Sequence, residues 1–265
     1  MAIEQGLYKY LKVIPIGGTA ISVPVSSSGM KFNSETKDIR AVGSRKPYVL
    51  YSGEIKYSGS FDAILIPSII DVLKLAYQED TNGYLKEFDV DDGEVALKNC
   101  KLSSLKISIP LGKPITCSFD FVAKSKDTGT SVSAPTISVA FVPSNITLSG
   151  IADYDCESID ISISNSLKEI YGLKGTDAKK PKFIAEGEQK IEVEVKYIEN
   201  PGLDIDNISV IDEGSISIKG TDDTTTFSIS LTKLIASNID KNTKKDDIIR
   251  FGVSYIAKDI SFSIS

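Results

Sequence analysis

The sequence predicts a mainly β protein made of two tandem, internally duplicated β-sandwich or half-barrel domains, with a short helix in the first. Long stretches alternate apolar and polar residues, as strands with one buried face do. In addition, the stretch from Gly29 to Leu65 recurs in the second half of the chain. An apolar content of 41% and a charged content of 25% are those of an ordinary soluble protein, so each domain can form its own core.

The alternation keeps its phase in the repeat. Met30 and Phe32 correspond to Ile161 and Ile163, so apolar positions of one strand fall on apolar positions of the other. A shift by one residue would turn every side chain of a strand to the opposite face. The conserved phase therefore indicates a copied module, and we expect one domain at residues 1–128 and a second at residues 129–265.

The first domain is predicted to contain strands, one helix and one long loop. Ser68 is the expected N-cap of the helix and Asp71 a favourable acid in its first turn. The Asp91-Asp92-Gly93 sequence predicts a hairpin turn. The expected strands are residues 8–16, 20–25, 30–39, 54–66, 84–90, 95–109 and 113–124, with a loop at 40–52, the helix from 68 to about 78 and a linker at 125–135.

The second domain is predicted to repeat this order. Lys233-Leu234 is matched to Lys101-Leu102, and the segment 200–205, which replaces the helix, is too short for more than a turn. The expected strands are residues 136–142, 145–149, 157–171, 187–198, 251–258 and 260–264, with an extended loop at 172–184.

The composition argues against catalysis and against nucleic-acid binding. The chain has no His, which removes the usual general base and the commonest metal ligand. No phosphate loop or nucleophile elbow is found, and the acidic run from Glu87 to Asp92 lacks the spacing of a calcium loop. A net charge of −6 without a basic stripe does not fit a nucleic-acid binder. We expect a non-enzyme without cofactor or metal.

The termini and cysteines suggest a reducing compartment. Three cysteines form no framework, and Cys100 and Cys117 lie in apolar strand contexts typical of buried free thiols. The first residues lack a signal-peptide pattern, and no stretch is long and apolar enough to cross a membrane.

The order of a long strand (29–39), an extended loop (40–52), a return strand (54–66), a helix (68–78) and closing strands (94–124) resembles the tail-tube proteins of long-tailed phages and archaeal viruses. The second copy departs from it by having almost no helix. The resemblance implies the variant with two tandem tube domains. It implies rings, here trimeric and pseudo-hexameric, whose inner strands close a barrel and which stack into a conduit for viral DNA.

The resemblance also implies sites and partners. The solvent faces of the two long strands would line the lumen, and the extended loops would contact the next ring. The candidate lumen residues are Lys31, Asn33, Glu35, Lys37, Ser162, Ser164, Ser166 and Lys168, and the candidate inter-ring residues are Arg45, Lys46, Pro47, Lys179, Lys180 and Pro181. Expected partners are further copies of the chain, the tape-measure, terminator and distal-tail proteins, and DNA in passage. The protein is expected in the virion tail, after assembly in the host cytoplasm.

The sequence leaves two other functional interpretations open. One is another ring of a tail or injection machine, such as a distal-tail, neck or secretion-tube component. The other is a non-viral two-domain β-sandwich that binds a ligand or protein, although the absence of Trp removes the favoured sugar-stacking platform.

Overall fold

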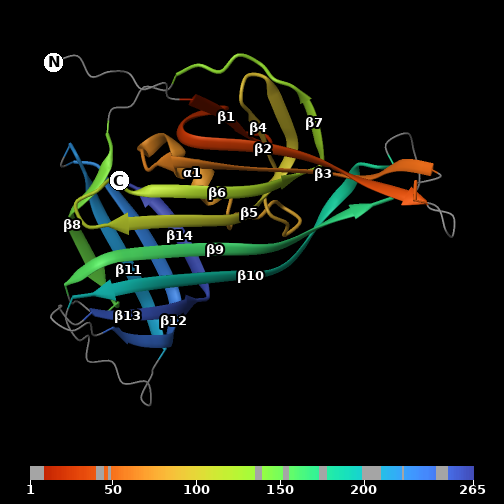
Figure 1. Ribbon diagram of the computed structural model, residues 1–265. Coiled ribbons are helices and arrows are strands. Elements are labelled where there is room, and N and C mark those ends of the chain that lie inside the picture. The colour runs from red at the N-terminus through yellow and green to blue at the C-terminus, as the bar shows by residue number, and fades with distance from the viewer. Residues whose placement is uncertain are drawn as a thin grey trace.

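The computed structural model describes residues 9–39, 45–46, 49–134, 139–151, 155–172, 178–198, 210–222, 224–242 and 250–265. These residues are mostly strand, with one short helix, which confirms the predicted fold class (Figure 1). In chain order the elements are β1 (Lys9–Pro15), β2 (Ile21–Ile39), β3 (Val49–Ile64), a 3-10 turn η1 (Pro67–Ile69), α1 (Ile70–Lys74), β4 (Phe88–Asp91), β5 (Val95–Pro110), β6 (Thr116–Ala123), β7 (Ser125–Thr128), β8 (Phe141–Ser149), β9 (Cys156–Tyr171), β10 (Pro181–Tyr197), β11 (Ile211–Gly220), β12 (Thr226–Asn242), β13 (Arg250–Ala257) and β14 (Asp259–Ile264).

Eight strands from both halves form one continuous layer, in the order β2-β3-β6-β5-β9-β10-β13-β12. The remaining strands form a second layer behind it. β5 and β12 belong to both layers because each changes partners midway. The first part of β5 pairs with β4 and β7, and its last part pairs with β6 and β9.

The core lies between the two layers. Along β6 every second side chain is buried, namely Cys117, Phe119, Phe121 and Ala123, while those between them face the other side. Phe61 of β3 stacks on Phe119 with ring centroids 4.4 Å apart. The predicted alternation therefore marks the buried and polar faces of the eight-stranded layer. Burial of apolar area on this scale is the main force that holds the layers together.

The second half repeats the pairing pattern of the first. Tyr57 pairs with Ala123, and Ile191 pairs with Ala257, so both members lie 134 residues further along the chain. The pairs of β2, β3, β4, β5, β6 and β7 have counterparts among β9 to β14, and β1–β4 corresponds to β8–β11. The β1–β2 pair has no counterpart among the described residues.

Local irregularities repeat as well. The β2–β3 ladder shifts register between Ser34 and Thr36, and the β9–β10 ladder shifts at the corresponding place, between Asn165 and Leu167. Among the described residues, the non-glycine residues with positive φ are Asn99 and Lys233, 134 residues apart and both with φ of 51°. A bulge is a specific backbone feature, so its recurrence means that the two halves share local backbone geometry as well as their pairing pattern. The division at residues 1–128 and 129–265 stays a prediction.

Several expected boundaries were wrong. The strands expected at 20–25 and 30–39 are one strand, β2, and the linker expected at 125–135 begins with β7, which pairs with β5. Both expected extended loops end earlier than predicted: β3 begins at Val49 and β10 at Pro181, so residues 49–52 and 181–184 belong to strands. The segment 200–205 lies outside the described residues.

The helix is shorter than predicted and begins differently. A 3-10 turn starts at Pro67, and the α-helix covers Ile70–Lys74 with no side-chain cap, so Ser68 is not the N-cap. Asp71 does lie in the first turn and pairs with Lys74 at 2.8 Å. Lys233-Leu234 does not correspond to Lys101-Leu102, because the shared positive φ aligns Lys233 with Asn99.

Close packing at Gly59 gives a testable prediction. A Cβ at Gly59 would lie 2.4 Å from the Phe121 ring, whereas a Cβ at Gly252 would lie in ordinary contact, 3.8 Å from Asp240. We expect Gly59→Ala to destabilise the monomeric chain by about 1–3 kcal/mol through overpacking, measured by urea unfolding. Gly252→Ala is the matched control and should stay within about 0.5 kcal/mol of the native chain. Equal losses in the two variants would contradict the packing argument.

Candidate functional site: the polar sheet face and the projecting hairpins

The polar face of the eight-stranded layer contains half of the predicted lumen residues. Lys31 and Asn33 of β2 lie opposite Ser58 and Lys56 of β3, and the face continues across β6 and β5. Ser162 and Ser164 of β9 lie on the same face, opposite Lys106 and Ser104 of β5. Ser162 is half-buried and Lys31, Asn33 and Ser164 are exposed. The structure therefore brings these four residues onto one surface.

The other predicted lumen residues lie on the hairpins. Pairing of β3 with β6 ends at Tyr57, and pairing of β9 with β5 ends at Ser164, so the chain beyond these points leaves the layer. Glu35, Ser166 and Lys168 are exposed on these hairpin portions. Lys37 lies on the backbone of β2, and its side chain is outside the described residues.

Charge on the polar face is close to balanced. The cross-strand registers place five lysines and six carboxylates there among the described side chains. They are Lys31, Lys56, Lys106, Lys190 and Lys196, with Asp62, Asp120, Asp160, Glu192, Glu194 and Asp240. The remaining described positions are mainly Ser and Thr. Such a face offers no continuous cationic surface.

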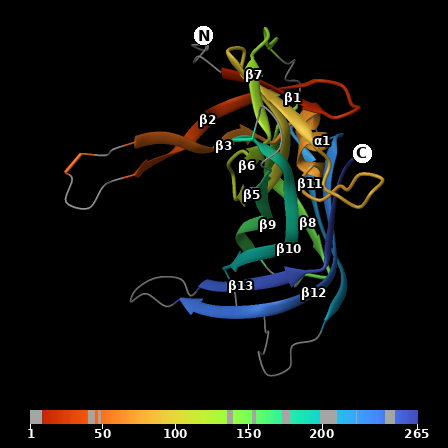
Figure 2. The same ribbon diagram turned by 90° about the vertical axis from the view of Figure 1, so that its right-hand side faces the viewer.

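Two hairpins, β2–β3 and β9–β10, project beyond the body of the protein (Figures 1 and 2). The tip of the second hairpin contacts the first hairpin near the point where β3 leaves the layer: the Ile55 amide donates to the Lys179 carbonyl at 2.8 Å, and the Tyr171 hydroxyl donates to the Ile55 carbonyl at 3.2 Å. Burial, assisted by the charges of Glu169 and Glu54, raises the pKa of Tyr171 to about 12. The hydroxyl therefore stays a neutral donor at physiological pH.

The predicted inter-ring residues differ in their solvent exposure. Arg45 and Lys46 are exposed near the tip of the first hairpin, and Lys179 is exposed in the turn before β10. Lys180 is half-buried, and Pro181 is buried at the start of β10, so Pro181 is not a contact residue on the surface. Pro47 lies outside the described residues.

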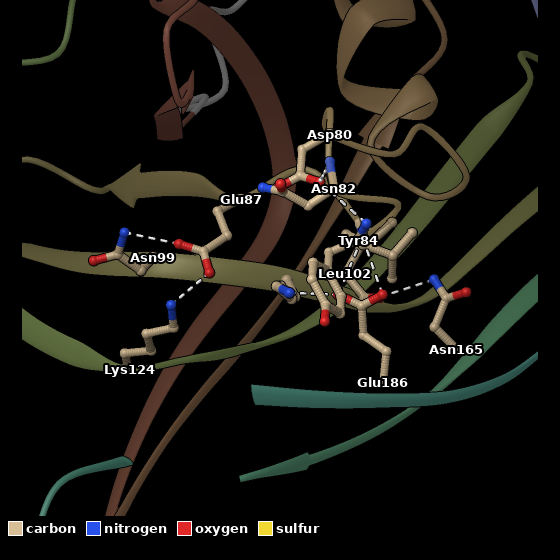
Figure 3. A network of polar contacts seen from close by, with 11 residues as sticks. Asp80, Asn82, Tyr84, Glu87, Asn99, Leu102, Lys124, Asn165 and Glu186 are labelled. Atoms are coloured by element: carbon tan, nitrogen blue, oxygen red, sulfur yellow. Dashed lines mark hydrogen bonds and ion pairs between the residues drawn. The ribbon is translucent and has the colours of Figure 1, made fainter. Parts of the chain in front are cut away.

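A buried polar network fixes the base of the second hairpin to the first half of the chain (Figure 3). Lys101 of β5 pairs with Glu186 of β10, and their side chains are only 6% and 17% exposed. Glu186 also accepts from the Leu85 amide at 3.0 Å. The two charges compensate each other where little water reaches them. A buried ion pair is stable when further hydrogen bonds, such as the one from the Leu85 amide, satisfy its charged groups.

Two amides extend the network. The Asn165 side chain donates to the carbonyls of Ala76 and Leu102 at 3.0 and 2.9 Å. Gln189 donates to Ala76 and to the Asn165 side-chain oxygen. Sequence reasoning missed this network, although Lys101 between Cys100 and Leu102, and Asn165 after Ile161 and Ile163, are polar residues at buried positions. Because it joins the α1 segment, β5, β9 and β10, the network holds the two halves in one orientation.

The acidic residues between Glu87 and Asp92 form ion pairs and hydrogen bonds that stabilise the fold. Glu87 pairs with Lys124 and accepts from Asn99, as Figure 3 shows, and Asp89 pairs with Lys98 at 2.9 Å. Asp91 is buried and accepts from the amide and hydroxyl of Thr130. Within the described ranges, no group of three or more His, Cys, Asp or Glu side chains could hold a metal ion.

The cysteines have the predicted character. Cys100 and Cys117 are completely buried free thiols, and Cys156 is half-buried. Burial raises the pKa of all three thiols, so they stay protonated and weakly nucleophilic.

Comparison with known proteins identifies one family. Residues 71–263, from α1 to β14, match the family model described as phage tail tube protein. No curated protein matches the chain. In the part of the chain that the structure describes, no helix has the length and apolar character to cross a membrane.

The Lys101–Glu186 pair gives a second prediction. Lys101→Met leaves the Glu186 charge buried without its cation, and we expect a loss of about 3 kcal/mol in the free energy of unfolding. In a double-mutant cycle with Glu186→Gln, the coupling energy should exceed about 1.5 kcal/mol. Urea unfolding of the monomeric chain provides the measurement.

The control cycle uses Lys190→Met and Glu192→Gln. This pair has a 2.7 Å contact, but its side chains are 51% and 46% exposed. Solvent-exposed pairs couple by less than about 1 kcal/mol. A coupling at Lys101–Glu186 no larger than that of the control would show that the network does not hold the hairpin.

Proposed function

The chain belongs to the phage tail tube protein family, and from this premise we propose that its copies close into rings that stack as a passive conduit for viral DNA. The family accounts for a structural role in the virion tail. The observation that carries the finer proposal is the eight-stranded layer, which has one polar face and ends on both sides in partly unpaired strands. A curved layer of this kind can close only by adding further copies of itself.

Three copies per ring follow if each chain contributes two domains to a ring of six tube domains, as the resemblance to tail-tube proteins implies. If residues 1–128 and 129–265 are two tube domains, each contributes four strands to the layer, and three chains supply six such sets. The repeated registers, the repeated bulge and the shared φ of Asn99 and Lys233 support this reading. The ring would then have threefold symmetry and approximate sixfold symmetry.

The polar face is proposed to line the lumen. Each lysine that contacts a phosphate adds salt-dependent affinity for DNA, and a conduit must avoid such retention. The near balance of lysines and carboxylates on this face, together with its many Ser side chains, meets that requirement. Lys31, Asn33, Ser162 and Ser164 would lie in the wall, and Glu35, Lys37, Ser166 and Lys168 would lie toward one end of the ring.

The hairpins are proposed to contact the next ring. They leave the end of the layer where β3 meets the end of β6, whereas the turn at residues 111–115 lies at the opposite end, hydrogen-bonded through Ile115 to Phe141. The turn that begins at Asp222 lies at that opposite end too, since Thr221 donates to Ala140. The basic tips of one ring would thus meet this acidic turn of the next.

The acidic run from Glu87 to Asp92 is a weaker acceptor for the tips. Glu87 and Asp89 already pair with Lys124 and Lys98 within the chain. Among the described residues, Asp222 accepts hydrogen bonds from its own turn, at Thr224 and Thr225, and these bonds lower its pKa and keep it charged. The tape-measure, terminator and distal-tail proteins are the further partners that we propose, with assembly in the host cytoplasm.

Electron microscopy of the purified chain tests the proposal. We expect tubes built from stacked rings, with threefold symmetry after averaging and two matching densities per chain. Isolated closed rings that never stack would instead favour another ring component of the tail. Monomers alone, at concentrations up to the solubility limit, would contradict ring assembly.

Charge reversal tests the stacking contact. The double variant Lys46→Glu, Lys180→Glu should shorten or abolish tubes while rings persist, because like charges would then face each other at the ring boundary. Tube lengths are measured in negative-stain images. Lys106→Glu, at an exposed lysine within the β5–β9 ladder and away from both ends of the layer, is the control and should leave tube length unchanged. Normal tubes from the double variant would remove the role of the basic tips.

A further inference from the structure

We propose that β12 of one copy pairs with β2 of the next copy, in the antiparallel register that β5 and β9 have within the chain. The proposal rests on ring assembly as proposed above and specifies the strands and residues that form the contact between subunits. Its starting point is that the chain already contains one example of the contact.

The internal example is the ladder between β5 and β9. It runs from Ser104 opposite Ser164 to Pro110 opposite Ser158. Its apolar face is fully covered, since Leu105 and Ile163, which lie opposite each other, are each 1% exposed. This ladder joins the fourth strand of the first half to the first strand of the second half.

The corresponding strands at the two ends of the layer have open edges. Residues 235–242 of β12 pair with β13 on one side, while β11 and β14 reach only as far as Leu234. β2 pairs with β3 from Val25 to Ile39, while β1 covers only residues 21–25. Among the described strands, nothing pairs with the second edge of either segment. Open edges of this length are templates for pairing with another chain.

The repeat fixes the register of the proposed contact. β5 corresponds to β12 by a shift of 134 residues, since both ladders with the next strand shift register at the same place, Leu102/Ser104 and Ala236/Asn238. β9 corresponds to β2, because the bulge at Asn165 matches that at Ser34. Applied to the internal ladder, these shifts place Asn238 opposite Asn33, Ile239 opposite Phe32 and Asp240 opposite Lys31.

The side chains at these positions complement one another. Asp240 and Lys31, both exposed on the polar face, have opposite charge and would form a cross-strand pair. Phe32 is 39% exposed and Ile239 is half-buried, whereas their internal counterparts Ile163 and Leu105 are buried. The contact would therefore cover apolar area that the single chain leaves in water. A head-to-tail contact between different edges generates a ring when its rotation closes.

Disulfide trapping tests the register. Directly opposite residues of an antiparallel ladder have Cβ atoms about 4.5–5.5 Å apart, close enough for a disulfide after small adjustment. Within one chain, Lys31 and Asp240 lie on strands seven spacings apart, roughly 34 Å at about 4.8 Å per strand. A disulfide between them therefore has to link two copies.

The experiment uses the full chain with Cys156→Ser, since the other native thiols are buried. We expect Lys31→Cys, Asp240→Cys to give covalent dimers and trimers on non-reducing gels under assembly conditions, in at least about half of the chains. The matched control, Glu35→Cys with Asp240→Cys, moves one cysteine four residues along β2, about 13 Å, and should give little product.

The outcomes separate the two proposals. Rings in the microscope without the Lys31–Asp240 crosslink, or with an equal crosslink in the control, would overturn the register and leave ring assembly standing. Absence of any ring or tube from the native chain would overturn ring assembly and this contact with it.

A charge swap covers the case in which the cysteine variants fail to fold. Lys31→Glu alone and Asp240→Lys alone should each raise the concentration needed for assembly by roughly fivefold, through repulsion across the joint. The double variant Lys31→Glu, Asp240→Lys should return it to the native value. Single variants that assemble normally, or a double variant no better than the singles, would contradict the pairing.

Discussion

The structure depends on the need of every buried backbone amide and carbonyl for a partner. An eight-stranded layer meets this need between its strands and fails at its two ends, where parts of β2 and β12 have no partner on one side among the strands that the structure describes. Natural β proteins cover, shorten or close such edges. Here the edges are long, and the hydrophobic side chains beside them, Phe32 and Ile235, are exposed. The proposed ring closure would satisfy both the backbone groups and the apolar surface.

Much of the fold follows from residue patterns. Alternation at Ile161 and Ile163 identified the buried face of β9 correctly, and the repeat located its counterpart in β2. Partner changes were not predictable, because local sequence does not state where β5 leaves β4 for β9. The mismatch of Lys233 has a similar cause: similar side chains were aligned, whereas the backbone equivalence is set by a positive φ.

The candidate site was predictable in part for the same physical reason. The period of two gives the face of a side chain, so Lys31 and Ser162 were placed on the polar surface. The period does not tell how far a side chain lies from the body of the protein. Glu35 and Ser166, which lie on the hairpins, were therefore predicted for the same surface as Lys31 and Ser162. The Lys101–Glu186 pair joins residues 85 positions apart, and such a pairing becomes visible only when β5 and β10 are brought together.

The internal and external joints differ in a way that suits their tasks. The β5–β9 joint is flanked by the buried network of Lys101, Asn165, Glu186 and Gln189, which fixes the halves of one chain. At the β12–β2 joint, the repeat replaces each residue of this network by its counterpart from the other half of the chain. The counterparts of Lys101, Asn165, Glu186 and Gln189 are Ile235, Ser34, Ser52 and Ile55, so no buried ion pair or amide network would form there. That joint would depend on strand pairing, on apolar contact and on the exposed pair of Lys31 and Asp240. Such a contact would form without first burying charges, so rings could assemble from separate chains and still gain stability from many copies in a tube.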